Sequence, residues 1–302
     1  MSAFLSVATV TTVGLACKAF LNSGLSTIQV NGLQILRDAL DGRNRDPNRG
    51  VLTVCNHIST LDDPVTWGIL PAHYYLSSRT TRWALGASDI MFTNPVFSTF
   101  FSLGQTLETF RGKGIYQDAV DTAILKLDQG QWVHLYGEGK VNQPKDYRRD
   151  KEGRVCIPIF KWGVGRILME TNVPPVVIPM WLTGFDQLMP EGRPFPNKYL
   201  PRIGARMSVT FGQPISADKL RESLVVSPNN SDVVSSATGR FEQLKGWLGD
   251  AVKAQYAATS RSQQELLASL VRQKITALIH REVENLGRSV SASLLKNPSS
   301  NS

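Results

Sequence analysis

The stretch VLTVCNHISTLDDP, residues 51–64, decides the fold class. Its first five residues are apolar and β-rich, which predicts a short buried strand. Asp63 followed by Pro64 is typical of a helix N-cap and first helical residue, so a helix is expected from about Pro64. A strand that leads through a polar loop into a helix is the unit of an α/β fold. In such folds, functional residues lie beyond the carboxyl ends of the strands.

The same alternation continues downstream. Strands are expected within 82–92 and at 105–110, 131–136, 176–181 and 205–212, and helices at 94–103 and 115–129. Strands that alternate with helices predict a mainly parallel sheet covered by helices.

A histidine and an aspartate, His57 and Asp62, lie in the loop after the first strand. A tight loop can bring them together, and a carboxylate on one imidazole nitrogen leaves the other free to take a proton from a substrate alcohol. Backbone N–H groups near the helix start are expected to stabilise the resulting oxyanion. His73, His134 and His280 have no equivalent context. Spacing alone does not distinguish this pair from a chance occurrence.

Two further loops follow predicted strands. In ETFRGKG, residues 108–114, the cations Arg111 and Lys113 stand among glycines before a helix, and cations with helix N-terminal amides suit a phosphate. In YGEGKVN, residues 136–142, a glutamate stands between two glycines and is followed by a lysine. We expect Glu138 to pair with Arg111 and hold it for a phosphate. In isolation, either loop is equally consistent with an ordinary solvated turn.

The composition is that of a globular protein with a basic surface. Of 302 residues, 42% are hydrophobic and 19% charged, and the net charge is +8, which favours an anionic partner. No RNA-recognition, zinc-finger or helix-turn-helix signature points to nucleic acid. Three widely spaced cysteines suggest neither a disulfide framework nor a metal site.

The N-terminal residues are almost uncharged. Residues 3–16 are apolar, and Lys18 is the one charged residue among the first 36. Fourteen residues are fewer than the about 20 that cross a bilayer, and no signal-peptide features accompany them. We expect the segment to lie in one leaflet of a membrane, while a core helix and a single span stay open. Near the C-terminus, apolar residues between 267 and 286 fall at helical spacing, which favours a helix packed on the domain over a membrane role.

The order of these motifs resembles the glycerolipid acyltransferase superfamily with its His-x4-Asp block. Within it, the chain is most similar to the transacylases that remodel cardiolipin. The stretches that carry the resemblance are NHISTLDDP with WGIL (56–70), FFSLG (100–104), RGKGIYQ (111–117), WVHLYGEGKVN (132–142), FKWGVGRILME (160–170) and PVVIPMW (175–181). They thread residues 50–215, and the ends of the chain match little.

The resemblance implies an acyltransferase domain at 37–222. An apolar membrane-associated segment (1–36) precedes it, and a flexible connector (223–238), C-terminal amphipathic helices (239–296) and a disordered tail (297–302) follow. His57 is implied as the base and Asp62 as its partner. The substrate-binding residues implied are Arg111, Lys113, Glu138, Gly139 and Lys140.

The implied reaction moves an acyl chain from a phospholipid such as phosphatidylcholine to monolysocardiolipin, giving cardiolipin, without coenzyme A, another cofactor or a metal. The implied location is the interface of mitochondrial membranes, inner or outer, facing the intermembrane space. A homo-oligomer is compatible with the resemblance, and nucleic acid is not an implied partner.

Two departures and two alternatives accompany the resemblance. Gly137 stands where the family usually has a proline, which affects the shape of the turn. Coenzyme A-dependent relatives usually continue with Ser or Thr and then Arg, where this chain has Lys140 and Val141. The alternatives are an acyl-CoA-dependent 1-acylglycerol-3-phosphate acyltransferase and a non-catalytic lipid-binding membrane protein.

Overall fold

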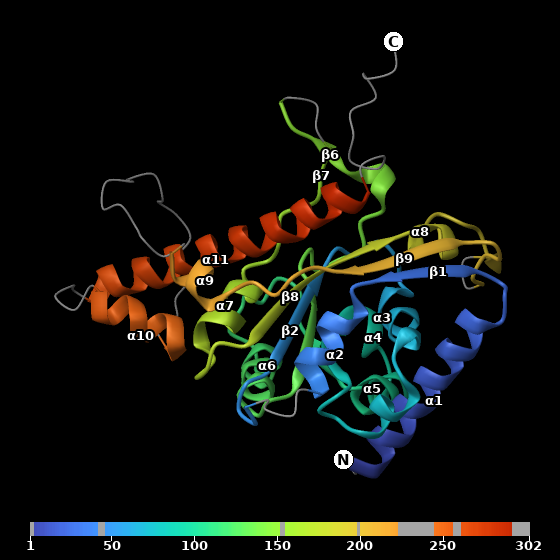
Figure 1. Ribbon diagram of the computed structural model, residues 1–302, viewed down its shortest axis with the longest axis horizontal. Helices are drawn as coiled ribbons and strands as arrows, with labels where there is room; N and C mark the ends of the chain where they lie inside the picture. Colours follow the sequence, from blue (N-terminus) through green and yellow to red (C-terminus); the bar gives the residue numbers. More distant parts are fainter. Residues whose placement is uncertain are drawn as a thin grey trace.

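The computed structural model describes residues 3–41, 46–151, 155–197, 200–222, 245–255 and 261–291. Its centre is a seven-stranded sheet with the order β1-β9-β8-β2-β5-β3-β4 (Figure 1). All neighbouring strands pair in parallel except β8 and β9, so the predicted mainly parallel sheet is confirmed. The strands are β1 (Thr27–Asn31), β2 (Val51–Cys55), β3 (Arg82–Ala87), β4 (Thr106–Thr109), β5 (Trp132–Tyr136), β8 (Val176–Thr183) and β9 (Arg206–Phe211).

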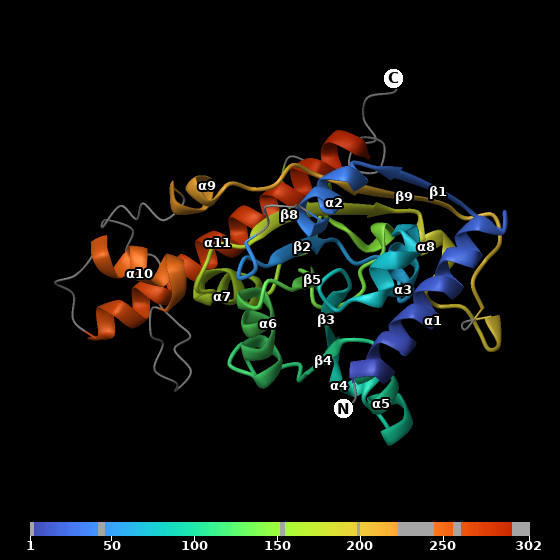
Figure 2. The same ribbon diagram turned by 60° about the horizontal axis from the view of Figure 1, so that its bottom comes forward.

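Helices cover both faces of the sheet (Figures 1 and 2). Along β2, Leu52 and Val54 join one buried cluster while Val51 and Cys55 join the other, as the alternation of side chains requires. The first cluster is completed by α6 (Asp118–Asp128), α7 (Gly163–Glu170), α9 (Ala217–Glu222), α10 (Gly246–Gln255) and α11 (Arg261–Val290). The second is completed by α2 (Leu33–Asp41), α3 (Asp62–Thr66), α8 (Phe185–Leu188) and the 3₁₀-helices η1 (Trp67–Ile69) and η2 (Ala72–Leu76).

Short elements connect these layers. They are α4 (Ser88–Met91), α5 (Pro95–Leu103), η3 (Pro144–Asp146) and the two-stranded hairpin of β6 (Arg148–Arg149) and β7 (Val155–Cys156). The start of α5 follows directly from its sequence, because the Asn94 side chain accepts the Phe97 N–H (3.0 Å) and Pro95 occupies the first turn. The expected strands and helices are present, although α6 begins at Asp118 instead of residue 115.

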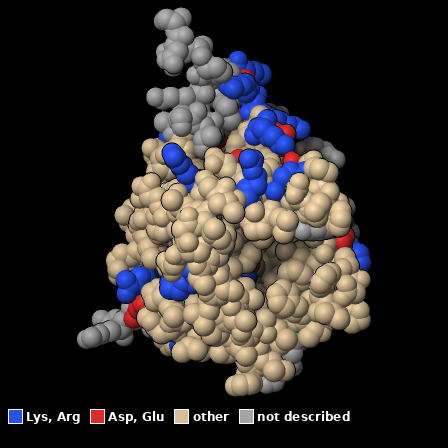
Figure 3. All heavy atoms as spheres, turned by 90° about the vertical axis from the view of Figure 1, so that its right-hand side faces the viewer, with Lys and Arg blue, Asp and Glu red and all other residues tan. Residues whose placement is uncertain are grey.

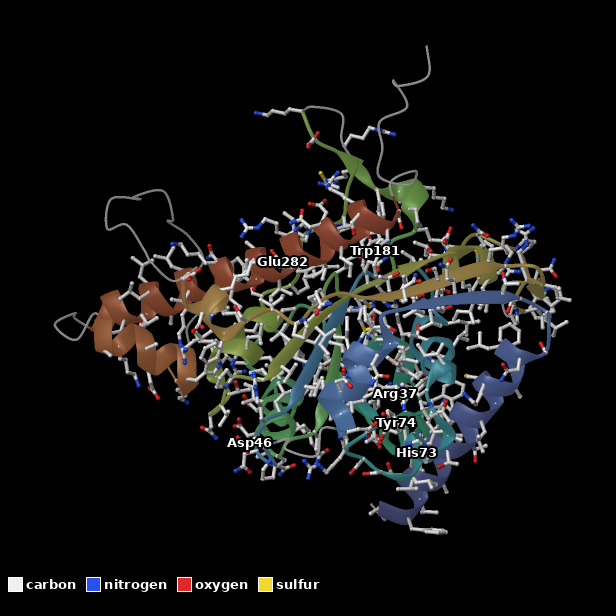
Figure 4. All side chains as sticks on the ribbon, viewed as in Figure 1. Arg37, Asp46, His73, Tyr74, Trp181 and Glu282 are labelled. Carbon is white, nitrogen blue, oxygen red and sulfur yellow. The ribbon has the colours of Figure 1, made fainter. Side chains whose placement is uncertain are left out.

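The long C-terminal helix packs on the sheet, as its apolar stripe predicts. Trp181 projects from β8 to α11 (Figure 4), and a Cβ added at Gly287 would lie only 2.7 Å from its ring. The Trp181 indole N–H also donates to Ser291 Oγ (2.9 Å). Glycine at 287 therefore lets the helix approach the tryptophan closely. The predicted connector (223–238) and tail (297–302) lie outside the described residues.

The N-terminal segment ends earlier than predicted. Residues 27–31 form β1, which pairs with β9, so they belong to the sheet and not to a membrane segment reaching residue 36. The residues TIQVN do not by themselves predict a strand, because the stability of a parallel edge strand depends on the strand with which it pairs. Before it, α1 (Ala3–Asn22) is long and apolar enough to cross a membrane, and 6% of its apolar window is buried.

Helix α1 docks on the folded domain through one side. Its single lysine, Lys18, donates from Nζ to the carbonyls of Gly68 (3.3 Å) and Leu70 (2.8 Å), and Thr11 Oγ1 donates to the Tyr75 carbonyl (3.2 Å). The other side exposes large apolar residues, namely Phe4, Leu5 and Leu15. The helix is therefore neither enclosed in a core nor separate from the domain.

Candidate active site

The loop after β2 is fixed to β8 by a buried asparagine. Asn56 Nδ2 donates to the Leu182 carbonyl (3.0 Å), and Asn56 Oδ1 accepts the Leu182 N–H (2.8 Å). This paired contact sets the point at which the chain leaves the sheet, so the next residue, His57, starts from a defined position. The sequence places Asn56 in the motif but does not reveal this role, because its partner lies 126 residues away.

His57 and Asp62 meet across this loop. The distance from His57 Nδ1 to Asp62 Oδ2 is 2.9 Å, and the same carboxylate oxygen accepts the backbone N–H groups of Ile58 (2.7 Å) and Ser59 (2.9 Å). Because a carboxylate can only accept, Nδ1 carries the hydrogen of the neutral imidazole. Nε2 is then the nitrogen that can take a proton.

His57 is partly exposed and Asp62 is buried. This suits a base that must reach substrate and a partner that only orients it. Asp62 is fully buried, whereas 19% of the His57 side chain is exposed. Burial raises the pKa of Asp62 above its ordinary value, while the hydrogen bonds from His57, Ser59 and Ile58 oppose that rise. The imidazole is thus accessible from outside, and its partner is not.

The predicted start of the helix was wrong by two residues. Helix α3 begins at Asp62, and its N-cap Leu61 makes no side-chain cap. Asp63 does not cap the helix because it is engaged in a partly buried ion pair with Arg82, whose Nε lies 2.9 Å from Asp63 Oδ1, and it accepts the Trp67 indole N–H (3.0 Å). Burial alone would raise the pKa of Asp63, but Arg82 holds it below its ordinary value.

The sequence alone did not predict a role for Arg82. It comes from β3, pairs with Asp63, and donates from Nη1 to the Gly104 carbonyl (2.8 Å), so it ties α3 to the end of α5. A single arginine at the start of a strand gives no signal of this role. The tandem Asp62–Asp63 is the one hint, because two adjacent carboxylates entering a helix need separate partners.

A second loop holds His57 from the opposite side. The Tyr136 ring stacks on the imidazole with centroids 4.1 Å apart, and Glu138 Oε1 accepts the His57 N–H (3.0 Å). Asn142 completes the clamp, because its N–H donates to the His57 carbonyl (2.7 Å) and its Nδ2 donates to Glu138 Oε2 (2.6 Å). Both ends of the His57 backbone are therefore fixed by the YGEGKVN loop.

The predicted pairing of Glu138 with Arg111 was wrong. Arg111 follows β4 and Glu138 follows β5, and β3 lies between these two strands, so their loops are kept apart. Arg111 pairs with Asp89 instead (3.2 Å). Glu138 is almost fully buried, and burial raises its pKa to about 8.

The glycines of the second loop have specific tasks. A Cβ at Gly137 would lie 2.4 Å from the Phe160 ring, so the glycine that replaces the usual proline makes room for Phe160. Gly139 has a φ of 71°, a left-handed conformation that favours glycine. Lys140 follows it at the rim of the cavity described below.

The loop that carries Arg111 and Lys113 is held by its own side chains. Gln117 Oε1 accepts the Phe110 N–H (2.7 Å), and Gln117 Nε2 donates to the Phe110 carbonyl (3.0 Å). Lys113 Nζ lies 4.5 Å from the centre of the Phe110 ring. Helix α6 carries Asp118 and Asp121 in its first turn, where acidic side chains oppose a phosphate. The expected phosphate site at the start of this helix therefore stays a prediction.

These loops surround one cavity of about 1390 Å³. His57, Arg111, Gly139 and Lys140 line it, whereas Asp62 and Glu138 contact His57 without lining the cavity. Lys113 lies over the ring of Phe110, which is a lining residue. Most of the remaining wall is apolar, and α1, β3, α5 and residues 159–167 are among the segments that contribute to it. Figure 3 views the side that carries α1, and shows a broad surface with few charged side chains and a hollow in it.

The other buried histidine is not a second base. His134 lies on β5 with its Nδ1 2.7 Å from Thr53 Oγ1, and burial lowers its pKa to about 3. It is therefore a neutral core residue at physiological pH. Among the described residues, no group of three His, Cys, Asp or Glu side chains is placed to hold a metal ion.

Comparison with known proteins identifies the family. The acyltransferase family model matches residues 27–183, from β1 to the end of β8, and this range contains every site residue above. A protein named taffazin from Dictyostelium discoideum is 35% identical over 234 residues, which cover 76% of each chain. The chain belongs to the acyltransferase family, in its tafazzin branch. It is an acyltransferase, and the α/β acyltransferase domain implied by the motifs is confirmed.

Other relatives of this acyltransferase match shorter ranges. Tafazzin from Drosophila melanogaster is 39% identical over 165 residues, or 55% of this chain and 40% of that one. N-acylphosphatidylethanolamine synthase from Arabidopsis thaliana is 39% identical over 184 residues, or 58% and 59% of the two chains. One relative of this chain therefore has a name that specifies a different acyl acceptor.

Proposed function

We propose that this acyltransferase transfers an acyl chain from a phospholipid to a lysophospholipid without coenzyme A, and that it converts monolysocardiolipin to cardiolipin with phosphatidylcholine as a donor. One observation carries the proposal. His57, whose Nδ1 lies 2.9 Å from Asp62, lines a large and mostly apolar cavity. A base beside an acyl-sized space suits the activation of a lipid hydroxyl.

The proposed reaction needs no protein nucleophile. His57 Nε2 takes the proton from the free hydroxyl of the lysophospholipid, and the oxygen attacks the ester carbonyl of the donor. The tetrahedral oxyanion collapses, the donor's C–O bond breaks, and His57 returns the proton to the leaving alcohol. One ester is lost and one is formed, so no activated donor is required and the reaction is reversible.

Three of the backbone amides near the start of α3 are already engaged within the protein. The N–H groups of Ile58 and Ser59 donate to Asp62, and that of Leu61 donates to Ser59 Oγ (3.2 Å). The first two therefore build the His57–Asp62 pair. Stabilisation of the oxyanion by another backbone N–H group near the helix start stays a prediction.

We assign the lipid phosphates to the cations at the cavity rim. Arg111 and Lys140 line the cavity, and Lys113 lies beside Phe110, which also lines it. Gly139 permits the turn that presents Lys140, and Glu138 supports the site by holding His57. A doubly phosphorylated headgroup such as that of cardiolipin suits three separated cations.

The exposed apolar residues favour work at a membrane surface. Phe4, Leu5 and Leu15 on α1 and Val96, Phe97 and Phe100 on α5 are exposed, and α1 and α5 contact each other. Both helices also contribute to the cavity wall. We propose that this surface inserts into one leaflet, so that acyl chains enter the cavity from the lipid phase.

The cellular location is a separate proposal. Following the tafazzin relatives, we place the enzyme on mitochondrial membranes, facing the intermembrane space. A net charge of +8 suits a membrane rich in anionic lipid.

A second acceptor chemistry has a specific observation in its favour. The 39% identity to N-acylphosphatidylethanolamine synthase raises transfer to the amine of phosphatidylethanolamine as an alternative. The same base can deprotonate an ammonium group as well as a hydroxyl. The coenzyme A-dependent alternative is disfavoured by Lys140 and Val141, and the intact His57–Asp62 geometry speaks against a non-catalytic lipid-binding protein.

The test is acyl transfer in liposomes. Purified protein is mixed with phosphatidylcholine labelled in its acyl chain, monolysocardiolipin and phosphatidylethanolamine, without coenzyme A. Label in cardiolipin supports the proposal, and label in N-acylphosphatidylethanolamine supports the amine alternative. Transfer that starts only after acyl-CoA is added contradicts both.

A further inference from the structure

Each cation of the Arg111 loop rests on a group that binds cations. Arg111 Nη1 lies 3.2 Å from Asp89 Oδ2, and Lys113 Nζ lies over the Phe110 ring, 4.5 Å from its centre. The Arg111 and Asp89 side chains are 45% and 60% exposed, so a ligand can reach both. Arg111 and Phe110 also line the cavity that His57 lines.

A second carboxylate is linked to the same short helix. Ser88 Oγ donates to Glu108 Oε1 (2.6 Å), and Ser88 and Asp89 are the first two residues of α4. Gln117 holds the backbone of Phe110 through two hydrogen bonds, so the ring and the adjacent Arg111 start from a fixed position. The start of α4, strand β4 and the loop after it therefore carry two carboxylates, an aromatic ring and two cations.

We propose that Asp89, Glu108, Phe110, Arg111 and Lys113 form a subsite for a zwitterionic phospholipid headgroup. The phosphate binds Arg111 and Lys113, and the ammonium group binds Asp89, Glu108 and the face of Phe110. This inference rests on the proposed function and names the class of acyl donor. Carboxylates and aromatic faces are the groups that recognise quaternary ammonium ions.

The physical basis is an exchange of partners. In the free protein, Arg111 neutralises Asp89 and Lys113 covers Phe110. When a zwitterionic headgroup enters, both cations turn to its phosphate, and its ammonium replaces them on Asp89 and Phe110. No charge is left unpaired. An anionic headgroup without an ammonium takes the cations but leaves Asp89 unpaired beside a phosphate, which is unfavourable.

The experiment is an internal competition between donors. Vesicles contain phosphatidylcholine and phosphatidylglycerol with distinguishable acyl labels, together with monolysocardiolipin, and the ratio of the two labels in cardiolipin is measured. Because both donors are in the same vesicle, a change in membrane binding or in protein stability affects both transfer rates equally and does not change their ratio. Wild type is expected to favour phosphatidylcholine. Asp89→Asn should lower the ratio by about fivefold, as expected for an ion pair worth roughly 1 kcal/mol.

Two further variants separate the parts of the subsite. Phe110→Leu should lower use of phosphatidylcholine relative to phosphatidylethanolamine, because the trimethylammonium group depends more on the ring. Asp218→Asn removes an exposed carboxylate of a distant ion pair on α9 and should leave every ratio unchanged.

Several outcomes overturn the inference. They are equal use of both donors by wild type, or a ratio that stays unchanged in both Asp89→Asn and the double variant Asp89→Asn/Glu108→Gln. Absence of transfer from any donor in wild type contradicts the proposed function itself, so the two failures are distinguishable.

Discussion

At the scale of single residues, the position of His57 is set by groups from two parts of the chain. Asp62 binds its Nδ1, Tyr136 stacks on its ring, and Glu138 and Asn142 bind its backbone. The loop after β2 and the loop after β5 thus build one site, because β2 and β5 are neighbours in the sheet. The base is oriented in its ring plane and along its backbone before substrate arrives.

Glu138 should make stability depend on pH. Burial raises its pKa from 4.5 to about 8, so over this range the folded protein binds a proton that the unfolded protein has released. The free energy of unfolding therefore falls as the pH rises from 4.5 towards 8. Glu138→Gln removes this effect while keeping an acceptor for the His57 N–H. The melting temperature of the variant, minus that of wild type, should rise between pH 5 and pH 9.

The control is Glu108→Gln, which changes an exposed carboxylate. The melting temperature of Glu108→Gln, minus that of wild type, should stay nearly constant over the same pH range. If the melting-temperature difference for Glu138→Gln is also constant, Glu138 is ionised in the folded protein over the whole range from pH 5 to pH 9.

The Gly137–Phe160 contact predicts a rescue. Gly137→Ala forces a Cβ against the Phe160 ring and should lower the free energy of unfolding by about 1–3 kcal/mol, as overpacking does. Gly137→Ala combined with Phe160→Leu should recover part of this loss, because the smaller side chain frees the space. Chemical unfolding of the three variants measures both effects, and additive losses would contradict the contact.

At the scale of elements, α1 is part of the catalytic domain as well as of its exposed apolar surface. Val10, Val13 and Gly14 contribute to the cavity wall, and Gly14 packs directly on the Tyr75 ring. An independent anchor would not need these contacts. The cavity wall is therefore complete only when α1 is docked on the domain.

Lys18 should hold α1 in place. Lys18→Met removes the two hydrogen bonds to the carbonyls of Gly68 and Leu70, and hydrogen bonds from a charged group contribute about 1.5–3 kcal/mol. We expect faster amide hydrogen exchange in α1 and lower transfer activity. Lys253→Met, at an exposed ion pair on α10, is the matched control. Unchanged exchange in Lys18→Met would mean that apolar contacts alone dock the helix.

The elements could be predicted where local rules decide them. The run 51–55 is buried on both faces and reads as a strand from its apolar residues, and Asn94 with Pro95 marks the start of α5. β1 could not be predicted, because its place depends on pairing with β9, about 180 residues away. In the site, His57 and Asp62 are close in sequence and could be paired. The links of Glu138 to His57 and of Arg82 to Asp63 arise from strand order, which the sequence does not display.

At the scale of the whole molecule, apolar and basic surfaces are arranged for a lipid interface. In Figure 3, few charged side chains interrupt the broad surface around the hollow, and Lys and Arg side chains gather above it. The net charge of +8 adds long-range attraction to anionic lipid. We expect insertion of the apolar part and attraction of the basic part to act together.

Removing one exposed apolar side chain should weaken membrane binding without unfolding the protein. Val96 on α5 is 75% exposed, and Val96→Asp should lower partitioning into liposomes by about tenfold, since burying a valine contributes roughly 1.5 kcal/mol or more. Leu125→Asp on α6, away from α1 and α5 in Figure 2, is the control. Equal partitioning of both variants in liposome sedimentation would place the membrane contact elsewhere.

The central claim is that His57, oriented by Asp62, is the base of a coenzyme A-independent acyl transfer. The most direct measurement is transfer of labelled acyl chains from phosphatidylcholine to monolysocardiolipin in liposomes without coenzyme A, with wild type, His57→Ala and Asp62→Asn. Wild type should form labelled cardiolipin, and both variants should lose about a hundredfold or more of this rate while binding the liposomes normally. Transfer by His57→Ala at the wild-type rate would contradict the account.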